Sequence, residues 1–321
     1  MNNINKLPVM ELVTPTMKKI IEDQLSSSEN FDTDASLDVL RFNYEKERLF
    51  WNTDDEFVMK SIEDNLISYN GIDVKTRIYT PKISSNNLIY FIHGGGWVVG
   101  SNNTHDRIMR ALADLTNSVV IGIDYSLSPE AKFPTAIIES ATVIEYYNVN
   151  AKKYGWQNFK TYLAGDSAGA NMCVGTYLYL KDKKITNIHI SGMLLYYGLY
   201  GLKDSVSRSL LGGPWDGLTA EDLIFYNKTY LSKEADIENS WFTIFNADLS
   251  DFPPSFIASC ELDPLRDDSV ALHNIITVNN SNHKYKNYKG VIHGFLHYSK
   301  VLPEAIEALK DGAKFINELK D

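Results

Sequence analysis

The chain has 321 residues, enough for a complete enzyme core with an insertion, and its 44% hydrophobic and 22% charged residues are typical of a soluble globular protein. Its formal net charge of −10 argues against nucleic acid, and against an anionic membrane, as the main partner. No apolar run approaches the roughly 20 residues needed to span a bilayer, so we expect no membrane-spanning segment.

The N-terminus and the cysteines indicate a compartment. Met1–Met10 contains one lysine and lacks the apolar segment of a signal peptide. The two cysteines, Cys173 and Cys260, lie in a predicted helix and a predicted strand and cannot form the disulfide framework of a small secreted domain. We therefore expect a cytoplasmic protein.

Residues 1–55 precede the regular part of the chain and are predicted to be helical. Thr14-Pro15 has the residue types of an N-cap and a first helical residue, and an apolar stripe follows it. A second helix is expected from Ser36 to about Phe50. These helices belong to no strand pattern, so they are candidates for a separate layer over the rest of the molecule.

From about residue 63, strands and helices alternate, which is typical of a mostly parallel sheet covered on both faces. The expected strands lie near residues 64–69, 74–80, 88–92, 118–123, 159–164, 188–196, 254–260 and 284–288. The expected helices lie near residues 104–116, 134–148, 168–181, 266–278 and 302–319. Residues 56–198 and 249–321 would form this core, and residues 199–248 an insertion with a helix near 220–231.

Three consecutive glycines follow the predicted strand 88–92, within the run His93–Trp97. Glycines at the end of a strand let backbone N–H groups face a cavity without a side chain in the way, and Gly95 and Gly96 could stabilise an oxyanion in this manner. A phosphate loop would require a Lys-Ser/Thr pair after the glycines, or a G-x-G-x-x-G spacing, and neither is present.

A second motif follows the strand 159–164 and opens a helix. In the run Gly165, Asp166, Ser167, Ala168, Gly169, the spacing G-x-S-x-G is that of a nucleophile elbow, a turn so sharp that its flanks require glycine. The serine hydroxyl would stand clear of the backbone, where a histidine can activate it. The N–H group of Ala168 would join the glycine loop in an oxyanion hole.

An acid and a base for this serine are expected downstream, each just beyond a predicted strand. Asp263 follows strand 254–260, and His293 follows strand 284–288. The order serine, aspartate, histidine is that of α/β-hydrolases rather than of the common proteases. Asp267 and Asp268 are rival acids but fit the first turn of a helix, and His297 is a rival base one turn further from the strand end.

The motifs His-Gly-Gly-Gly, Gly-Asp-Ser-Ala-Gly, Asp-Pro-Leu and His-Gly-Phe together resemble the hormone-sensitive-lipase branch of the α/β-hydrolases. Within that branch the chain is similar to the bacterial acetyl esterases, in stretches that include residues 104–110, 125–130, 210–218 and 295–299. The resemblance implies an α/β-hydrolase fold with an eight-stranded, mostly parallel sheet flanked by helices. It also implies that residues 1–55 and 199–248 pack together as a helical cap over the active site; helices that only shield the sheet are the alternative.

The expected chemistry is hydrolysis of a carboxylic ester by Ser167, with His293 as general base and Asp263 orienting it. The resemblance implies short acyl chains, from acetyl to about octanoyl, on a small-molecule substrate, and neither a cofactor nor a metal. An interfacial lipase, or a hydrolase-like protein with a binding or regulatory role, are the alternatives, and protein partners cannot be read from the sequence.

Five neighbouring residues have more than one possible role. His93 is expected to orient the glycine loop through a backbone hydrogen bond. Asp166 could cap the following helix or contact the cap, and Glu130 is expected to fix its own loop. Trp97 and Phe295 are expected to form walls of the substrate pocket.

Overall fold

The computed structural model describes residues 6–26, 35–52, 56–278 and 282–319. Parts of the predicted N-terminal region, namely residues 1–5, 27–34 and 53–55, lie outside the described residues, and with them half of Met1–Met10. Within the described parts of the chain, no helix is long and apolar enough to cross a membrane.

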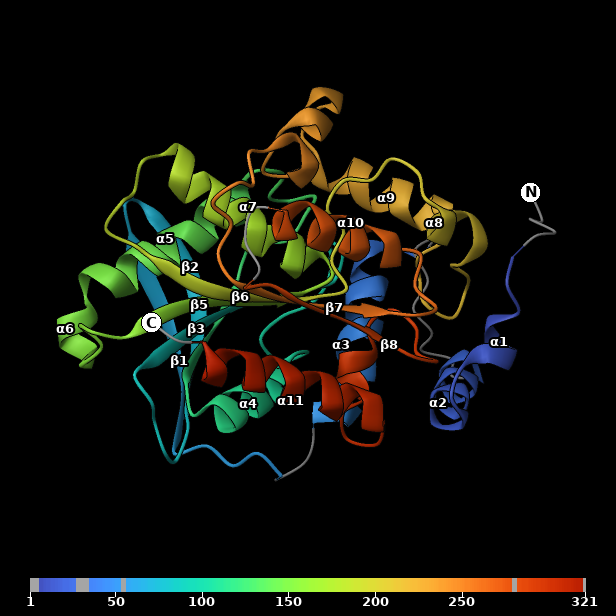
Figure 1. The fold of residues 1–321 in the computed structure, drawn as a ribbon, viewed down its shortest axis with the longest axis horizontal. Coiled ribbons are helices and arrows are strands. Elements are labelled where there is room, and N and C mark those ends of the chain that lie inside the picture. The colour runs from blue at the N-terminus through green and yellow to red at the C-terminus, as the bar shows by residue number, and fades with distance from the viewer. Residues whose placement is uncertain (1–5, 27–34, 53–55, 279–281, 320–321) are drawn as a thin grey trace.

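A single eight-stranded sheet forms the centre of the molecule (Figure 1). Its strands are β1 (Ser61–Tyr69), β2 (Ile72–Thr80), β3 (Asn87–Ile92), β4 (Val119–Asp124), β5 (Lys160–Asp166), β6 (Ile190–Tyr196), β7 (Ser255–Cys260) and β8 (Lys284–Tyr288). The spatial order is β1-β2-β4-β3-β5-β6-β7-β8. β2 runs antiparallel to β1 and β4, and every other pair is parallel. The predicted mostly parallel sheet of eight strands is therefore confirmed.

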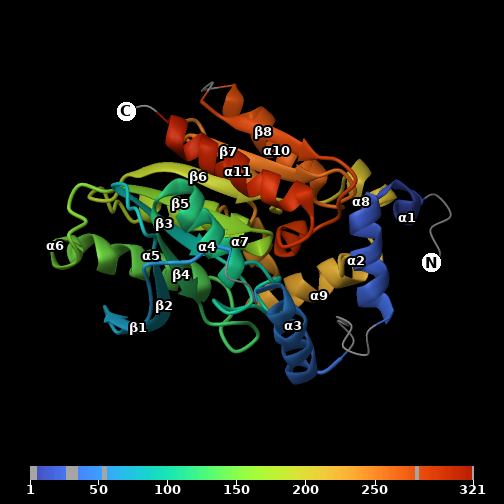
Figure 2. The same cartoon turned by 90° about the horizontal axis from the view of Figure 1, so that it is seen from below.

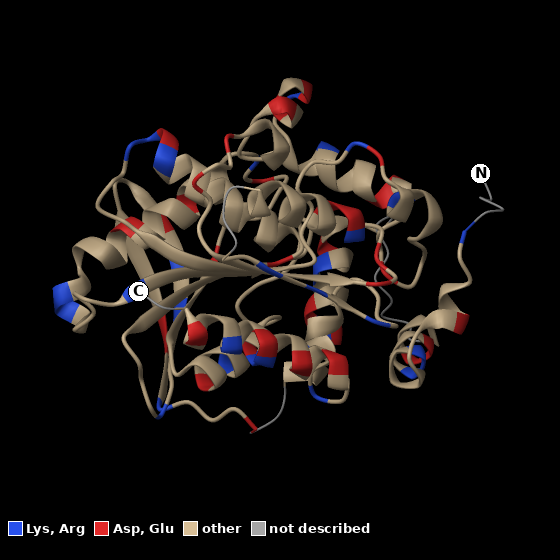
Figure 3. Ribbon diagram, in the orientation of Figure 1, with Lys and Arg blue, Asp and Glu red and all other residues tan. Residues whose placement is uncertain are grey.

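Helices cover both faces of this sheet, because the apolar inner strands must be shielded on each side. In Figure 1, one face carries α5 (Thr135–Val149), α7 (Ala168–Asp182) and α10 (Arg266–Thr277), and the other carries α4 (Asp106–Thr116) and α11 (Pro303–Glu318). The remaining short helices of the core are α6 (Ala151–Tyr154) and the 3₁₀ turn η3 (Phe295–Tyr298). Figure 3 shows charged residues of both signs on the outer surfaces of the flanking helices, with few on the inner strands.

The N-terminal region and the insertion are helical, as the sequence predicts. The N-terminal helices are α1 (Val9–Leu12), α2 (Pro15–Ser26) and α3 (Leu37–Asn52). The insertion holds α8 (Val206–Leu210), α9 (Ala220–Tyr230) and the 3₁₀ turns η1 (Glu234–Glu238) and η2 (Ile244–Asn246). A capping box starts α9, since Thr219 and Asp222 satisfy each other's backbone N–H groups. Figure 2 shows α2, α3 and α9 at the same end of the sheet.

Polar contacts near both ends of α3 attach it to the core. Near its start, Arg41 makes a two-pronged ion pair with Glu130, at 2.8 and 2.7 Å, and donates to the carbonyls of Val98 and Ser128. Glu130 therefore anchors the N-terminal helix α3, a wider role than the predicted fixing of its own loop. The first of these carbonyls lies two residues past the glycine loop, so the same contact ties α3 to that loop.

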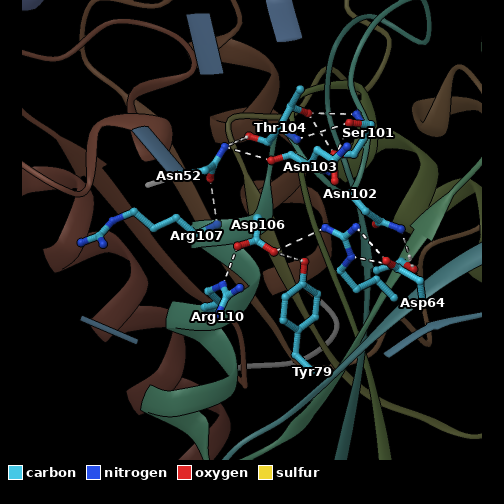
Figure 4. A network of polar contacts seen from close by, with 12 residues as sticks. Asn52, Asp64, Tyr79, Ser101, Asn102, Asn103, Thr104, Asp106, Arg107 and Arg110 are labelled. Atoms are coloured by element: carbon cyan, nitrogen blue, oxygen red, sulfur yellow. Dashed lines mark hydrogen bonds and ion pairs between the residues drawn. The ribbon is translucent and has the colours of Figure 1, made fainter. Parts of the chain in front are cut away.

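Further contacts lie at the end of α3 (Figure 4). Asn52 donates to the carbonyls of Asn103 and Thr104 and accepts the N–H of Arg107 at 2.8 Å. One side chain thus joins the end of α3 to the first turn of α4. The neighbouring Asp106 accepts the Tyr79 hydroxyl at 2.8 Å, which ties the same turn to β2.

Candidate active site

The predicted elbow lies at the junction of β5 and α7. Ser167 has φ 53° and ψ −123°, a conformation that non-glycine residues rarely adopt and that stores on the order of 1–3 kcal/mol of strain. A Cβ on Gly165 would lie 2.7 Å from the carbonyl oxygens of Ile92 and Gly169, and a Cβ on Gly169 would collide with the Ile92 carbonyl. Only glycine fits at both flanks, because β3, β5 and α7 meet there backbone to backbone.

Ser167, His293 and Asp263 form one hydrogen-bonded chain. His293 Nε2 lies 2.8 Å from the Ser167 hydroxyl oxygen, and His293 Nδ1 lies 2.8 Å from Asp263 Oδ2. The second oxygen of Asp263 accepts the N–H of Leu265 at 2.7 Å, and the carboxylate is fully buried. The three residues follow β5, β8 and β7, whose carboxyl ends lie at one edge of the sheet.

The surroundings of His293 favour its protonated form. Burial alone would lower its pKa, but the charge and hydrogen bond of Asp263, with the more distant carboxylates of Asp216 and Asp166, raise the pKa above the ordinary 6.5. The imidazolium that forms when His293 takes a proton is thereby stabilised.

This shift predicts the pH dependence of kcat/KM. A general base works only when neutral, so the rate should fall as the pH drops through the pKa of His293. Because that pKa is raised, the acid limb should lie above pH 6.5, the ordinary value for histidine. Measuring kcat/KM for a neutral ester between pH 5 and 9 checks this expectation, and an acid limb below 6 would contradict it.

The glycine loop and the elbow face the same cavity, which Gly95, Gly96 and Ala168 line together with Ser167. Gly95 and Gly96 have positive φ, 115° and 58°. A Cβ on Gly95 would collide with the Val99 carbonyl, and one on Gly96 with the ring of Tyr226 from α9. Both positions require glycine, because their φ is positive and because there is no space for a Cβ atom.

A buried polar cluster lies behind the loop. Asp166 Oδ1 accepts the N–H of Gly94 at 2.9 Å and lies 3.3 Å from Nε2 of His105. The ring of His297 lies edge-on to His105, with centroids 4.5 Å apart. One of the two roles predicted for Asp166, capping of the following helix, is not seen, since no side chain caps the start of α7. The carboxylate instead joins the elbow to the glycine loop.

The rival base His297 belongs to this cluster. Burial and the charge of Arg48 lower its pKa well below the ordinary value, so His297 is neutral. His105, Asp166 and His297 also form the group of described residues whose ligand atoms, all within 4.8 Å of one another, could hold a metal ion. Hydrolysis through Ser167 needs no ion there.

The two rival acids, Asp267 and Asp268, accept hydrogen bonds from the backbone of the insertion. Asp268 accepts three successive backbone N–H groups at the start of the insertion, those of residues 200–202, at 2.8, 3.1 and 3.2 Å. Its other oxygen pairs with Arg208 at 2.8 Å. Asp267 accepts the N–H of Ser207 at 2.8 Å. Both lie in the first turn of α10, as predicted.

His93 behaves as the sequence predicts. Its Nδ1 lies 2.8 Å from the carbonyl oxygen of Gly94, and its ring stacks on Tyr125 at 4.3 Å. The Tyr125 hydroxyl in turn donates to the His93 carbonyl at 3.0 Å. These contacts fix the start of the glycine loop.

Of the two predicted pocket walls, one lines the cavity. Trp97 lines it and stacks flat against Tyr230 from α9, with ring centroids 4.4 Å apart. Phe295 does not, and this expectation is corrected: its side chain is fully buried and packs against Tyr197 and Tyr288 in the core. Gly294, just before it, has φ 75°, and the tight 3₁₀ turn that follows directs residue 295 inward.

The cavity measures about 470 Å³ and takes walls from the core, the N-terminal helices and the insertion. Walls that the sequence does not assign to the pocket are Ile20, Tyr44, Arg48, Trp215, Asp216 and Tyr226. The run of residues 212–217 contains glycines and a Trp-Asp pair typical of a turn, but no spacing relates it to the serine. The N-terminal region and the insertion thus contribute jointly to the walls above Ser167.

Known proteins resemble the chain along nearly its whole length. The family model described as the α/β-hydrolase fold matches residues 89–297. The acetyl esterase of Salmonella agona is 45% identical over 312 residues, which cover 97% of this chain and 96% of that protein. The acetyl esterase of Salmonella enteritidis matches to the same extent. The resemblance to bacterial acetyl esterases is confirmed.

Solved structures give the same result. A hyperthermophilic esterase from the archaeon Pyrobaculum calidifontis superposes with a TM-score of 0.89 at 31% identity, covering 95% of this chain and 98% of that one. A thermostable carboxylesterase cloned from a metagenomic library has a TM-score of 0.83 at 26% identity and covers 89% of this chain and 98% of its own. With the sheet order and the matched residues, these likenesses show that the chain belongs to the α/β-hydrolase fold family.

Proposed function

We propose that this protein is a serine carboxylesterase that hydrolyses short-chain acyl esters of small molecules, with Ser167 as nucleophile, His293 as general base and Asp263 as the acid that orients it. One observation carries the proposal: the continuous hydrogen-bonded chain from Ser167 through His293 to Asp263, with both links 2.8 Å long, beside a cavity lined by the glycine loop. The esterase relatives support the same reaction class.

The reaction proceeds in two halves. Ser167 Oγ attacks the ester carbonyl carbon while His293 Nε2 takes the hydroxyl proton. The bond to the alcohol oxygen breaks, the departing alkoxide takes the proton from His293, and the acyl group stays on Ser167. In the second half His293 takes a proton from water, the resulting hydroxide attacks the acyl carbon, and Ser167 recovers its proton as the carboxylic acid leaves.

The negative charge that develops on the carbonyl oxygen in each half is stabilised by backbone N–H groups of Gly95, Gly96 and Ala168. Each such donor contributes about 3–4 kcal/mol to the transition state in comparable sites. The Asp166 contact with Gly94 supports this role, because it fixes the loop from behind before substrate binds. Asp263 stabilises the imidazolium of His293 throughout.

The walls of the cavity favour small acyl groups. Its volume of about 470 Å³ lies toward the lower end of the usual range, about 300–1,000 Å³, for ligand pockets. The Tyr226 ring lies directly against Gly96, and Trp97 is fixed by its stacking on Tyr230. These aromatic walls limit the space beside the nucleophile, so the preferred esters range from acetyl to about octanoyl.

The proposal also covers the compartment and the partner of the enzyme. Cys173 and Cys260 are both buried free thiols, as is usual for proteins of the reducing cytoplasm. The net charge of −10 makes a small neutral ester a more suitable partner than nucleic acid.

A series of p-nitrophenyl esters from acetate to palmitate tests the proposed substrate class. We expect kcat/KM to peak between acetate and octanoate and to fall steeply beyond, because longer chains exceed the cavity. A maximum at palmitate, rising further above its solubility limit, would indicate an interfacial lipase. A folded protein inactive on every ester would indicate a binding or regulatory role.

A further inference from the structure

The loop of residues 212–218 carries a carboxylate that the catalytic chain does not use. Asp216 Oδ1 accepts the N–H groups of Gly213 and Leu218 at 3.1 and 3.0 Å, so the side chain is held by its own loop. Gly212 and Gly217 have positive φ, 89° and 60°, which closes the turn tightly around it. The orientation of this carboxylate is therefore fixed by the backbone before any ligand binds.

The second oxygen of Asp216 has no such partner. Oδ2 is buried and accepts no hydrogen bond from any residue that the structure describes, yet the residue lines the same cavity as Ser167 and His293. A buried carboxylate oxygen without a donor is costly, and native proteins keep few of them. Because Asp216 lines the substrate cavity, a donor carried by the substrate would remove that cost.

The loop that carries Asp216 packs against the segment that carries Asp263. A Cβ on Gly212 would lie 3.5 Å from Pro264 Cγ, which places the start of the loop against the residue that follows Asp263. Burial raises the pKa of Asp216 to about 7; the Asp263 charge adds to the rise, whereas the loop N–H groups and His293 oppose it. The carboxylate therefore lies close enough to the catalytic pair to interact with both members.

The packing of the 212–218 loop against the segment that carries Asp263 indicates which half of the substrate meets Asp216. His293 gives its proton to the departing alcohol, so the alcohol half of the ester lies next to the imidazole. A hydroxyl group on that alcohol, two or three carbons from the ester oxygen, would donate to Oδ2. Plain alkyl alcohols would leave Oδ2 without a partner.

The geometry points to Asp216 as a specificity residue that binds a free hydroxyl on the alcohol half of the substrate. The preferred substrates would then be short-chain monoesters of diols and other polyols rather than esters of simple alkanols. This inference rests on the proposed esterase function and refines its substrate class. It assigns no part in bond breaking to Asp216.

A matched pair of esters tests the inference at pH 8, where Asp216 is largely ionised. 2-Hydroxyethyl acetate and propyl acetate differ by a hydroxyl in place of a methyl group. We expect the ratio of their kcat/KM values in the wild type to exceed the ratio of their rates of alkaline hydrolysis by about tenfold, since hydrogen bonds to charged groups are the strong ones. An equal ratio would overturn the inference.

Three variants test whether Asp216 causes this preference for the hydroxyl-bearing ester. Asp216→Asn keeps an oxygen for Gly213 and Leu218 but removes the charge, so the ratio of the two kcat/KM values should fall about fivefold. Asp216→Ala should bring the ratio down to that of alkaline hydrolysis. Glu221→Gln, an exposed acid in the first turn of α9, should leave the ratio as in the wild type.

Two outcomes separate this inference from the proposed function. If the wild type turns over propyl acetate and neither Asp216 variant changes the ratio, Asp216 only stabilises its loop and the inference is wrong while the esterase stands. If the folded wild type hydrolyses neither ester, the proposed function itself fails. A preference for methyl 3-hydroxypropanoate over methyl butanoate, with none between the two acetates, would place the hydroxyl on the acyl half and also overturn the assignment.

Discussion

Replacing Ser167 by alanine should lower kcat for p-nitrophenyl acetate by about 10⁶-fold, the loss seen when a triad nucleophile is removed. The reason is that no other described hydroxyl lies within hydrogen-bond distance of His293 Nε2. The fold should persist, because alanine occupies the same turn and loses only the hydroxyl. Steady-state kinetics and a thermal melt measure both effects.

Ser140→Ala is the matched control for this variant. Ser140 is fully buried, and its hydroxyl donates to the carbonyl of Ala136 within α5, away from the cavity. Its removal should leave kcat as in the wild type. If the Ser167 variant kept more than a trace of turnover, or if the Ser140 variant lost it, the assignment of the nucleophile would be wrong.

Replacing Asp263 by asparagine should lower kcat by about 10⁴-fold while leaving the fold intact. The amide can still accept the Leu265 N–H through its oxygen, but its NH₂ group then faces His293 Nδ1. The imidazole would be held in the wrong tautomer, with its proton on Nε2, and could no longer accept the proton of Ser167. Kinetics on p-nitrophenyl acetate check the loss.

Asp267→Asn is the control, since it changes the same groups four residues further along the chain. Asp267 accepts the N–H of Ser207 and should affect the insertion, not the rate of proton transfer. The Asp263 variant should also lose the upward shift of the acid limb, because that carboxylate is the main group that raises the His293 pKa. A 10⁴-fold loss in the Asp267 variant instead would identify a different acid.

Residues that follow strands were the easiest to place from the sequence. Ser167, Asp263 and His293 each come a few residues after a predicted strand, and parallel strands present their carboxyl ends at one edge. Their convergence therefore follows from topology alone, and the structure brings all three within 2.8 Å contacts. The same reasoning placed the glycine loop after β3. The helical nature of the insertion was also predicted.

The walls of the cavity could not be predicted in this way. Arg48, Asp216 and Tyr226 meet there although more than 150 residues separate the first from the others, and no local periodicity specifies such a contact. Phe295 shows a second limit. Its place next to the catalytic histidine suggested a pocket wall, but the positive φ of Gly294 directs it into the core.

Asp166 shows a third limit. The motif places it beside the nucleophile, where capping of α7 was one of two expectations, but its carboxylate contacts the N–H of Gly94 and the ring of His105. Those partners lie more than 60 residues upstream and come close only when β3 and β5 pair. Asp166 therefore makes long-range contacts with the glycine loop and with His105 and not the local contact that would cap α7.

Covalent labelling of Ser167 is the measurement that tests the central claim most directly. A phosphonate that carries a good leaving group, such as a p-nitrophenyl alkylphosphonate, should form one adduct per chain, and peptide mapping by mass spectrometry should locate it on Ser167. The Ser167→Ala variant should form none, and p-nitrophenyl acetate turnover should fall in proportion to the labelled fraction. A stoichiometric adduct on any other residue, or full ester turnover by the labelled protein, would contradict the account.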